Sequence, residues 1–286
     1  MATEFTVDKR NARRTFGKAA DGYDAAAVLQ HEIGQRMLDR LDYVKLQPKR
    51  ILDIGCGTGV AADKLLRRYP GSEVLALDFA LPMLAHARRR GRWLRRPRCV
   101  CGDLDALPLA SQSVDLVFSS SALQWSADPA HAIAEMHRVL RPGGLLMFSS
   151  FGPDTLFELR AAWGEVDGRA HVHGFVDMHD YGDMLLAAGM ADPVMDAERI
   201  RLTYADTRSL MRDLKAIGAN NAASDRPRGL TGRAQLTAFA RAYEGFRDAD
   251  ERLPATYEVV YGHAWAVGQR RQGNEVLISP EVLKRS

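Results

Sequence analysis

The sequence predicts an α/β fold built on a mostly parallel sheet that carries helices on both faces. After residue 50, short apolar segments alternate with segments of helical periodicity, and the first apolar segment runs into a glycine-rich turn. The predicted strands span residues 51–55, 74–78, 97–101, 114–119 and 145–150. The predicted helices between them span residues 60–68, 81–90 and 129–140. Ligands of such sheets bind outside the carboxyl ends of the strands, so the residues that follow each strand are candidates for a functional site.

Further elements are predicted on both sides of this region. The flanking helices span residues 9–20, 25–41, 209–217 and 234–246, and two more strands span residues 199–204 and 256–267. A loop rich in Gly, Pro and Arg, residues 225–232, separates the last two helices. The chain therefore has enough structure outside the central region to build a site of its own.

The composition is ordinary for a globular protein and excludes several classes. The 286 residues carry 39 Lys and Arg against 36 Asp and Glu, a net charge of +3. No apolar run reaches the ~18 residues of a membrane span, and residues 1–11 lack the apolar core of a signal peptide. Cys56, Cys99 and Cys101 have the spacing of neither a disulfide framework nor a zinc knuckle. We expect a cytoplasmic protein with no membrane contact and no metal site.

Basic side chains concentrate in residues 88–98, which contain seven arginines. The segment is either a solvated helix end, where the helix dipole favours cations, or a docking patch for an acidic partner. Single-stranded nucleic acid is usually bound with interleaved aromatic side chains, and Trp93 is the single aromatic residue here. Nucleic acid is therefore not expected as a partner.

The glycine turn predicts the kind of ligand. Gly55, Gly57 and Gly59 form a G-x-G-x-G pattern, which differs from the patterns of dinucleotide sites and phosphate loops. Glycine lets backbone approach a nucleotide-like ligand closely. No Lys follows to hold a phosphate, and Asp53, two residues before Gly55, would repel a pyrophosphate but attract an ammonium or sulfonium group. The pattern favours S-adenosylmethionine; the alternative is a tight turn without a ligand.

Two further carboxylates follow the next strands. Asp78 ends the second strand, where it can accept hydrogen bonds from both ribose hydroxyls. Asp103 follows the third strand, where it can accept from the adenine amino group while Leu104 backs the ring. An Asp at a strand end is often only a helix cap, but the ordered set of glycine turn, Asp78 and Asp103 supports the cofactor prediction.

This arrangement resembles the class I S-adenosylmethionine-dependent methyltransferases over residues 50–150. The motifs that carry the resemblance are Asp53–Gly59, Asp78, Gly102-Asp103, Asp115–Phe118 and Leu140–Gly144. The resemblance implies a Rossmann-like fold with a mostly parallel seven-stranded sheet, an N-terminal helical lid and a C-terminal helical insertion. It also implies S-adenosylmethionine as cofactor, converted to S-adenosylhomocysteine, and no metal. The expected cofactor-binding residues are Asp53, Gly55, Gly57, Gly59, Asp78, Asp103, Leu104 and Ser119.

The segments on either side of residues 50–150 narrow the resemblance to one family of methyltransferases. Phe16–Asp24 is similar to the lid of small-molecule and quinone methyltransferases. Together with Ala27–Gln30, Leu214–Asn221, Arg228–Gly232 and Thr256–Trp265, it resembles the malonyl-[acyl-carrier-protein] O-methyltransferases of biotin synthesis. This implies a lid (1–45), a cofactor-binding core (46–150), a substrate-covering insertion with the last strands (151–270) and a tail (271–286). The implied enzyme is a carboxyl O-methyltransferase that acts on malonyl-loaded, acidic acyl carrier protein or on malonyl-CoA, and a monomer is expected.

This reaction makes few demands on side chains, because a carboxylate is already ionised at neutral pH and needs no general base. Donors must still hold it, and Tyr23, Gln30 and Trp125 are the candidate catalytic residues. Arg201, Tyr204 and His263 are further candidates for substrate binding. Carrier docking is assigned to a basic group rather than to residues 88–98; the group comprises Arg208, Arg212, Lys215, Arg226, Arg228 and Arg233.

Three other functions compete with this one. The first is methyl transfer to a quinone or another small acid, which the motifs after residue 210 disfavour. The second is an assembly factor of a respiratory complex, since such proteins share the lid and a similar Leu214–Gly218 segment. The third is a non-catalytic cofactor-binding scaffold, which the intact Asp53, Asp78 and Asp103 disfavour.

Overall fold

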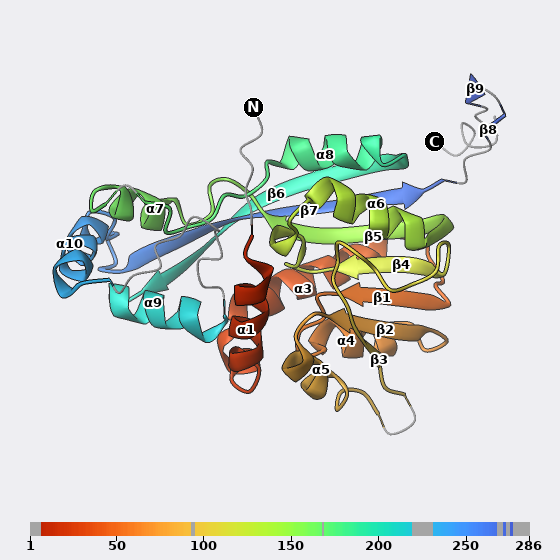
Figure 1. The fold of residues 1–286 in the computed structure, drawn as a ribbon, viewed down its shortest axis with the longest axis horizontal. Helices are drawn as coiled ribbons and strands as arrows, with labels where there is room; N and C mark the ends of the chain where they lie inside the picture. The colour runs from red at the N-terminus through yellow and green to blue at the C-terminus, as the bar shows by residue number, and fades with distance from the viewer. Residues whose placement is uncertain are drawn as a thin grey trace.

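A seven-stranded sheet in the order β3-β2-β1-β4-β5-β7-β6 runs through the molecule (Figure 1). The computed structural model describes residues 7–92, 95–167, 169–218 and 231–267, and the backbone of 271–272 and 275–276. The first five strands of this order are parallel, whereas β7 is antiparallel to both β5 and β6. The strands are β1 (Arg50–Ile54), β2 (Glu73–Asp78), β3 (Arg98–Cys101), β4 (Val114–Ser119), β5 (Leu140–Phe151), β6 (Met190–Tyr204) and β7 (Leu253–Ala266). The prediction of a mostly parallel sheet is confirmed.

Helices cover both faces of this sheet. Successive residues of β1 point to opposite sides, so that Ile51 joins one apolar cluster and Leu52 the other, and both are fully buried. One cluster is covered by α3 (Val28–Arg40), α4 (Val60–Arg68) and α5 (Leu81–Ala87). The other is covered by α6 (Pro129–Val139) and α8 (Met178–Ala187). Apolar residues on both faces make β1 a central strand, which places its carboxyl end in the middle of the molecule.

The N-terminal helix α1 (Lys9–Ala19) lies against α5 and against Gly218, just after the end of α9 (Thr207–Ala216). Phe16 of α1 packs with Ala80 and Met83, and the hydroxyl of Thr15 donates to the carbonyl of Gly218 over 3.1 Å. Figure 1 shows α1 in front of the ends of the parallel strands. The first helix is therefore placed as a cover over the carboxyl edge of the sheet.

Several elements differ from their predicted bounds. The predicted helix 25–41 is two helices, α2 (Tyr23–Ala26) and α3, because Ala27 leaves the helical conformation with ψ +43°. Strand β6 begins nine residues before the predicted residue 199. The sequence did not predict α7 (Phe157–Gly164) or α8, and α10 (Arg233–Glu244) follows α9 as expected. Within the described part of the chain, no helix is long and apolar enough to cross a membrane.

Candidate active site

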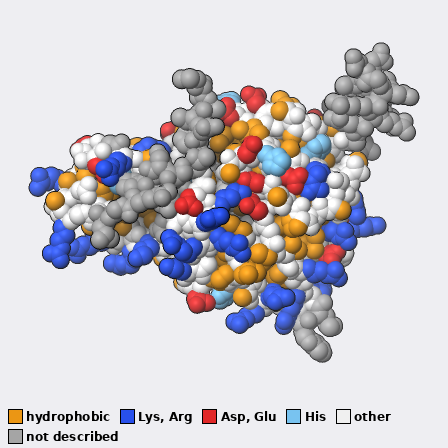
Figure 2. All heavy atoms as spheres, viewed as in Figure 1, with side chains coloured by type: hydrophobic (Ala, Val, Ile, Leu, Met, Phe, Trp, Pro, Cys, Tyr) orange, Lys and Arg blue, Asp and Glu red, His pale blue; other side chains and the backbone are white. Residues whose placement is uncertain are grey.

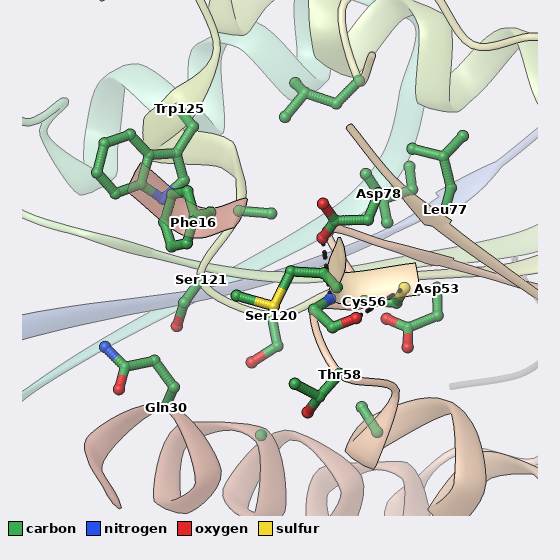
Figure 3. Close-up of a pocket in the computed structure, with 18 of the residues that line it drawn as sticks. Phe16, Gln30, Asp53, Cys56, Thr58, Leu77, Asp78, Ser120, Ser121 and Trp125 are labelled. Carbon is green, nitrogen blue, oxygen red and sulfur yellow. Dashed lines mark hydrogen bonds between the residues drawn. The ribbon is translucent and has the colours of Figure 1, made fainter. Parts of the chain in front are cut away.

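A cavity of about 140 Å³ lies at the carboxyl ends of the parallel strands (Figure 3). Its lining comes from the turn after β1, from the ends of β2 and β3, from the segment after β4 and from the N-terminal helices. The predicted site residues that line it are Tyr23, Gln30, Asp53, Gly55, Gly57, Asp78, Asp103, Leu104 and Trp125. The fold thus brings together residues that are up to about a hundred positions apart in the sequence.

The three glycines of the turn all have positive φ, but for different reasons. A Cβ at Gly55 would lie 2.4 Å from the Cβ of Ala122, and one at Gly59 would lie 2.8 Å from the Cβ of Ala87. A Cβ at Gly57 would meet only the Tyr23 ring, at 3.8 Å. Gly55 and Gly59 therefore allow close packing of the protein against itself. Of the three, Gly57 alone turns its missing side chain toward the lid.

Asp53 is a buried acidic residue that lines the cavity. Its side chain is 1 % exposed, and its Oδ2 has no hydrogen-bond partner among the described residues. Burial, followed by the charge of Asp78, raises the pKa of Asp53 to about 7. Such a group is stabilised in its ionised form by a cationic ligand group, as the sequence predicted for an ammonium or sulfonium.

Asp78 organises the glycine turn from the end of β2. Its Oδ2 accepts from the backbone N–H of Gly57 over 3.0 Å, and its Oδ1 accepts from that of Ala80 over 2.8 Å. Burial raises the pKa of Asp78 to about 6, while these backbone donors act in the opposite direction. Each carboxylate oxygen can accept a second hydrogen bond, so Asp78 can hold the turn and still bind ribose hydroxyls.

Asp103 lies in the cavity wall but is paired with the start of α1. Its Oδ1 accepts from the ammonium of Lys9 over 2.6 Å, and the same ammonium lies 2.5 Å from Oδ2 of Asp105. The adenine contact predicted for Asp103 would therefore share this carboxylate with Lys9. Sequence analysis missed Lys9, because nothing local connects residues 94 positions apart.

A second set of polar contacts joins α2 to the glycine turn. The carboxylate of Asp24 accepts from the Thr58 hydroxyl and from the guanidinium of Arg90, whose Nε also donates to the carbonyl of Thr58 over 3.2 Å. The neighbouring Tyr23 has its pKa raised by burial and then by the charges of Asp78 and Asp24. Tyr23 therefore stays protonated and is available as a hydrogen-bond donor.

The other end of the cavity is lined by neutral polar and aromatic side chains. Trp125 stands edge-on to Phe16 of α1 at 5.1 Å between ring centroids and lies 5.4 Å from the ring of His173. Three buried atoms there have no partner in the described structure: Gln30 Oε1, Ser121 Oγ and Gln124 Oε1. Sequence analysis identified Gln30 and Trp125 but missed the other two residues, whose positions depend on the loop after β4.

Several predicted site residues are not among the described lining of the cavity. Ser119 is buried in β4, and the chain reaches the cavity only with Ser120. Tyr204 donates to Asp213 over 3.0 Å, a contact that fixes α9 against β6. His263 lies within β7, whereas Arg201, Arg212 and Lys215 are exposed. Arg226 and Arg228 lie outside the described residues, as does most of the predicted tail.

The comparisons with known proteins agree with this geometry. Residues 52–148 match the family model described as a methyltransferase domain. A malonyl-[acyl-carrier protein] O-methyltransferase of Halorhodospira halophila is 54 % identical over 264 residues, which cover 92 % of this chain and 90 % of the relative. The protein with the same name from Gallionella capsiferriformans is 51 % identical over 93 % of this chain and 94 % of its own length.

The chain belongs to the malonyl-[acyl-carrier protein] O-methyltransferase family. Solved structures support the fold: a protein of Bacillus halodurans assigned as a methyltransferase covers 81 % of this chain with a TM-score of 0.57 at 18 % identity. The [4+2]-cyclase SpnF reaches a TM-score of 0.52 over 82 % of this chain at 21 % identity. These likenesses concern the fold alone. For a member of the malonyl-[acyl-carrier protein] O-methyltransferase family, the implied cofactor is S-adenosylmethionine, and the resemblance seen in the sequence is confirmed.

Proposed function

We propose that this protein transfers a methyl group from S-adenosylmethionine to the free carboxylate of a malonyl group carried by acyl carrier protein. The observation that carries this proposal is the similarity to the named relatives over more than nine-tenths of the chain. At this coverage the similarity extends well beyond the methyltransferase domain of residues 52–148 into the flanking segments, to which we assign acceptor specificity. The methyl ester would serve biotin synthesis, as the malonyl-[acyl-carrier protein] O-methyltransferase name implies.

The cavity fits the implied cofactor. The unpartnered carboxyl group of Asp53 is placed to bind an ammonium or sulfonium group, and the Asp78 carboxylate retains acceptor sites for ribose. Leu104 and Asp103 line the wall that would hold the adenine. When bound there, S-adenosylmethionine supplies an electrophilic methyl group on a positively charged sulfur.

Tyr23, beside the glycine turn, and the polar side chains at the other end of the cavity would hold the acceptor. Tyr23 remains protonated and can donate to a carboxylate oxygen, and the Gln30 side chain can do so through its amide. Trp125 and Phe16 form an apolar wall beside them. A carboxylate loses its charge when it becomes an ester, so neutral side chains around it favour that change. Positioning, rather than proton transfer, is the work of these side chains.

Tyr23 provides a direct test of the acceptor site. In a Tyr23→Phe variant, methyl transfer to malonyl-loaded carrier protein should fall about 10- to 100-fold, the effect of losing a hydrogen bond to a charged group. The affinity for S-adenosylhomocysteine should stay within about twofold, because the ring remains beside Gly57. An unchanged rate with unchanged cofactor affinity would remove Tyr23 from the site.

Basic side chains near the cavity entrance suit an acidic carrier protein. Lys and Arg side chains gather over α1, α9 and α10 (Figure 2). The exposed cations of α9 are Arg208, Arg212 and Lys215, and α1 adds Arg10, Arg13, Arg14 and Lys18. Ile217, at the end of α9, lines the cavity, so this surface leads directly to the acceptor site. Charges of one sign around an entrance steer a partner of opposite charge.

A genetic experiment tests the biological role. The gene should restore growth without biotin to a bacterium that lacks its own malonyl-[acyl-carrier protein] O-methyltransferase, while an Asp53→Ala variant should not. Growth restored equally by both would show that rescue does not depend on the cofactor site. No growth with a well-expressed wild-type protein would contradict the biotin assignment.

A further inference from the structure

The backbone at Ser121 is held in a conformation that its residue type disfavours. Ser121 has φ +52°, in the left-handed region that costs a residue with a Cβ about 1–2 kcal/mol. Two contacts maintain it: the Gln124 side-chain amide donates to the Ser121 carbonyl over 2.7 Å, and the Ser121 N–H donates to the Ser149 hydroxyl over 3.0 Å. Ser149 is fully buried in β5. A serine kept in this state by two side chains indicates a requirement for its own side chain.

The side chain of Ser121 has no partner within the described structure. Its Oγ is buried from solvent and lines the cavity. Figure 3 shows the hydroxyls of Ser120 and Ser121 on the side of the cavity that faces the Gln30 amide. A buried hydroxyl without a hydrogen bond is unfavourable, and a ligand that accepts from it would remove that cost. Strain and an unsatisfied polar atom thus coincide at one residue.

The charges around the cavity indicate which ligand group this is. Among the described lining residues, the ammonium of Lys9 is engaged by Asp103 and Asp105, and that of Lys64 donates to Gln35 over 2.6 Å. Burial lowers the pKa of His31, which favours its neutral form. Neutral side chains are therefore candidate donors for an anionic acceptor in this cavity. Gln30 of α3 and Ser121 of the segment after β4 are such donors.

We propose, on the basis of the methyltransferase function above, that the Ser121 hydroxyl donates a hydrogen bond to the carboxylate of the malonyl acceptor. Gln124 and Ser149 fix the backbone so that this hydroxyl projects into the cavity. The bond distinguishes a malonyl group, which ends in a carboxylate, from an acetyl group, which has no polar atom there. Ser121 is thereby a specificity-determining residue for a thioester with a free carboxylate.

The test compares two variants that separate the hydroxyl from the backbone strain. Ser121→Ala removes the hydroxyl and keeps the strain, whereas Ser121→Gly removes both. The dissociation constants of malonyl-loaded and acetyl-loaded carrier protein are measured on the full chain with S-adenosylhomocysteine bound. Wild-type protein should prefer the malonyl form, and in both variants that preference should fall roughly 10- to 100-fold. The affinity for S-adenosylhomocysteine alone should not change.

Other outcomes distinguish a failure of the Ser121 assignment from a failure of the proposed methyltransferase function. If Ser121→Gly keeps the wild-type preference, the residue has only a backbone role and the proposal is overturned, whatever the alanine variant does. If wild-type protein transfers no methyl group to malonyl-loaded carrier protein, the proposed function itself fails. An active wild type with unchanged discrimination in both variants contradicts the Ser121 assignment alone.

Discussion

Replacement of Asp53 by Asn should weaken the pH dependence of cofactor binding. The change removes the charge and keeps the size of the side chain. In the native protein the carboxyl group is buried, its Oδ2 has no partner among the described residues, and burial with the Asp78 charge raises its pKa to about 7. A cationic ligand group pairs with the ionised carboxylate only. Cofactor affinity should therefore increase as pH rises through the pKa of Asp53.

The size of the effect follows from that pKa. A group with a pKa of about 7 is roughly 1 % ionised at pH 5 and roughly 90 % ionised at pH 8. If binding requires the ionised form, the dissociation constant should fall by up to about 100-fold between these pH values. S-adenosylhomocysteine, which keeps the ammonium but lacks the sulfonium, should show the same slope if the ammonium is the partner of Asp53.

The raised pKa of Asp53 also makes the stability of the ligand-free protein depend on pH. The pKa of Asp53 is higher in the folded protein than its model value of 3.8, so the folded state holds the proton more tightly. Its stabilising contribution is fully present below about pH 4 and is lost as pH rises through about 7. Asp78, with a pKa raised to about 6, acts in the same direction. The ligand-free Asp53→Asn protein should thus lose less thermal stability than wild type between pH 5 and pH 8.

Calorimetric titration with S-adenosylhomocysteine at pH 5, 6, 7 and 8 measures the affinity, and a thermal melt at each pH measures the stability. Wild type should show the steep dependence and the Asn variant a weak one. Parallel pH profiles for the two proteins, with comparable affinities, would refute the assignment of Asp53 as the partner of the ammonium group.

Two further predictions concern the glycine turn and carrier docking. Gly55→Ala should destabilise the protein by about 2–5 kcal/mol, the sum of left-handed strain and a 2.4 Å clash with Ala122, whereas Gly143→Ala, which meets nothing within 4 Å, should cost only the strain of about 1–2 kcal/mol. Equal losses in urea denaturation would show that Gly55 is not needed for packing. Reversal of charge at Arg212 and Lys215 should raise the KM for malonyl-loaded carrier protein by about 10-fold at low salt, while the same reversal at Arg89 should not. An unchanged KM in the first variant would exclude α9 as the docking surface.

The elements that could be predicted from the sequence are those with local boundary signals. α4 (Val60–Arg68) follows Gly59, which has φ +83°, and ends just before Pro70, so its bounds matched the prediction. The predicted bounds of β4 were also correct, because Val114–Ser119 is an apolar run between turns. In both cases the neighbouring residues in the chain carry the information.

The remaining elements depend on contacts that local patterns do not contain. Asp192 and Pro193 are unfavourable in strands, but β6 accommodates them at a register shift opposite β7, so only its last six residues, 199–204, were predicted. The helix break at Ala27 has no Gly or Pro to mark it. Helix α8 contains Gly182 and a mixed pattern, which hid it from periodicity.

In the candidate site too, residues with a local sequence signal could be predicted, whereas those that depend on distant contacts could not. Asp53 and Asp78 could be identified because each stands in or at the end of an apolar strand. The pairing of Lys9 with Asp103 and the strained backbone of Ser121 could not, since each depends on residues distant in the sequence. The acceptor end of the cavity is therefore the part that the structure adds to the sequence analysis.

Methyl transfer to the malonyl carboxylate can be measured by following label from methyl-labelled S-adenosylmethionine into carrier-bound acyl groups. The purified protein is offered malonyl-loaded carrier protein, and in parallel the acetyl form and the malonyl form blocked as its amide. We expect label on the malonyl form alone, in a base-labile methyl ester. Label on the blocked or acetyl form, or no label on the malonyl form, would contradict it.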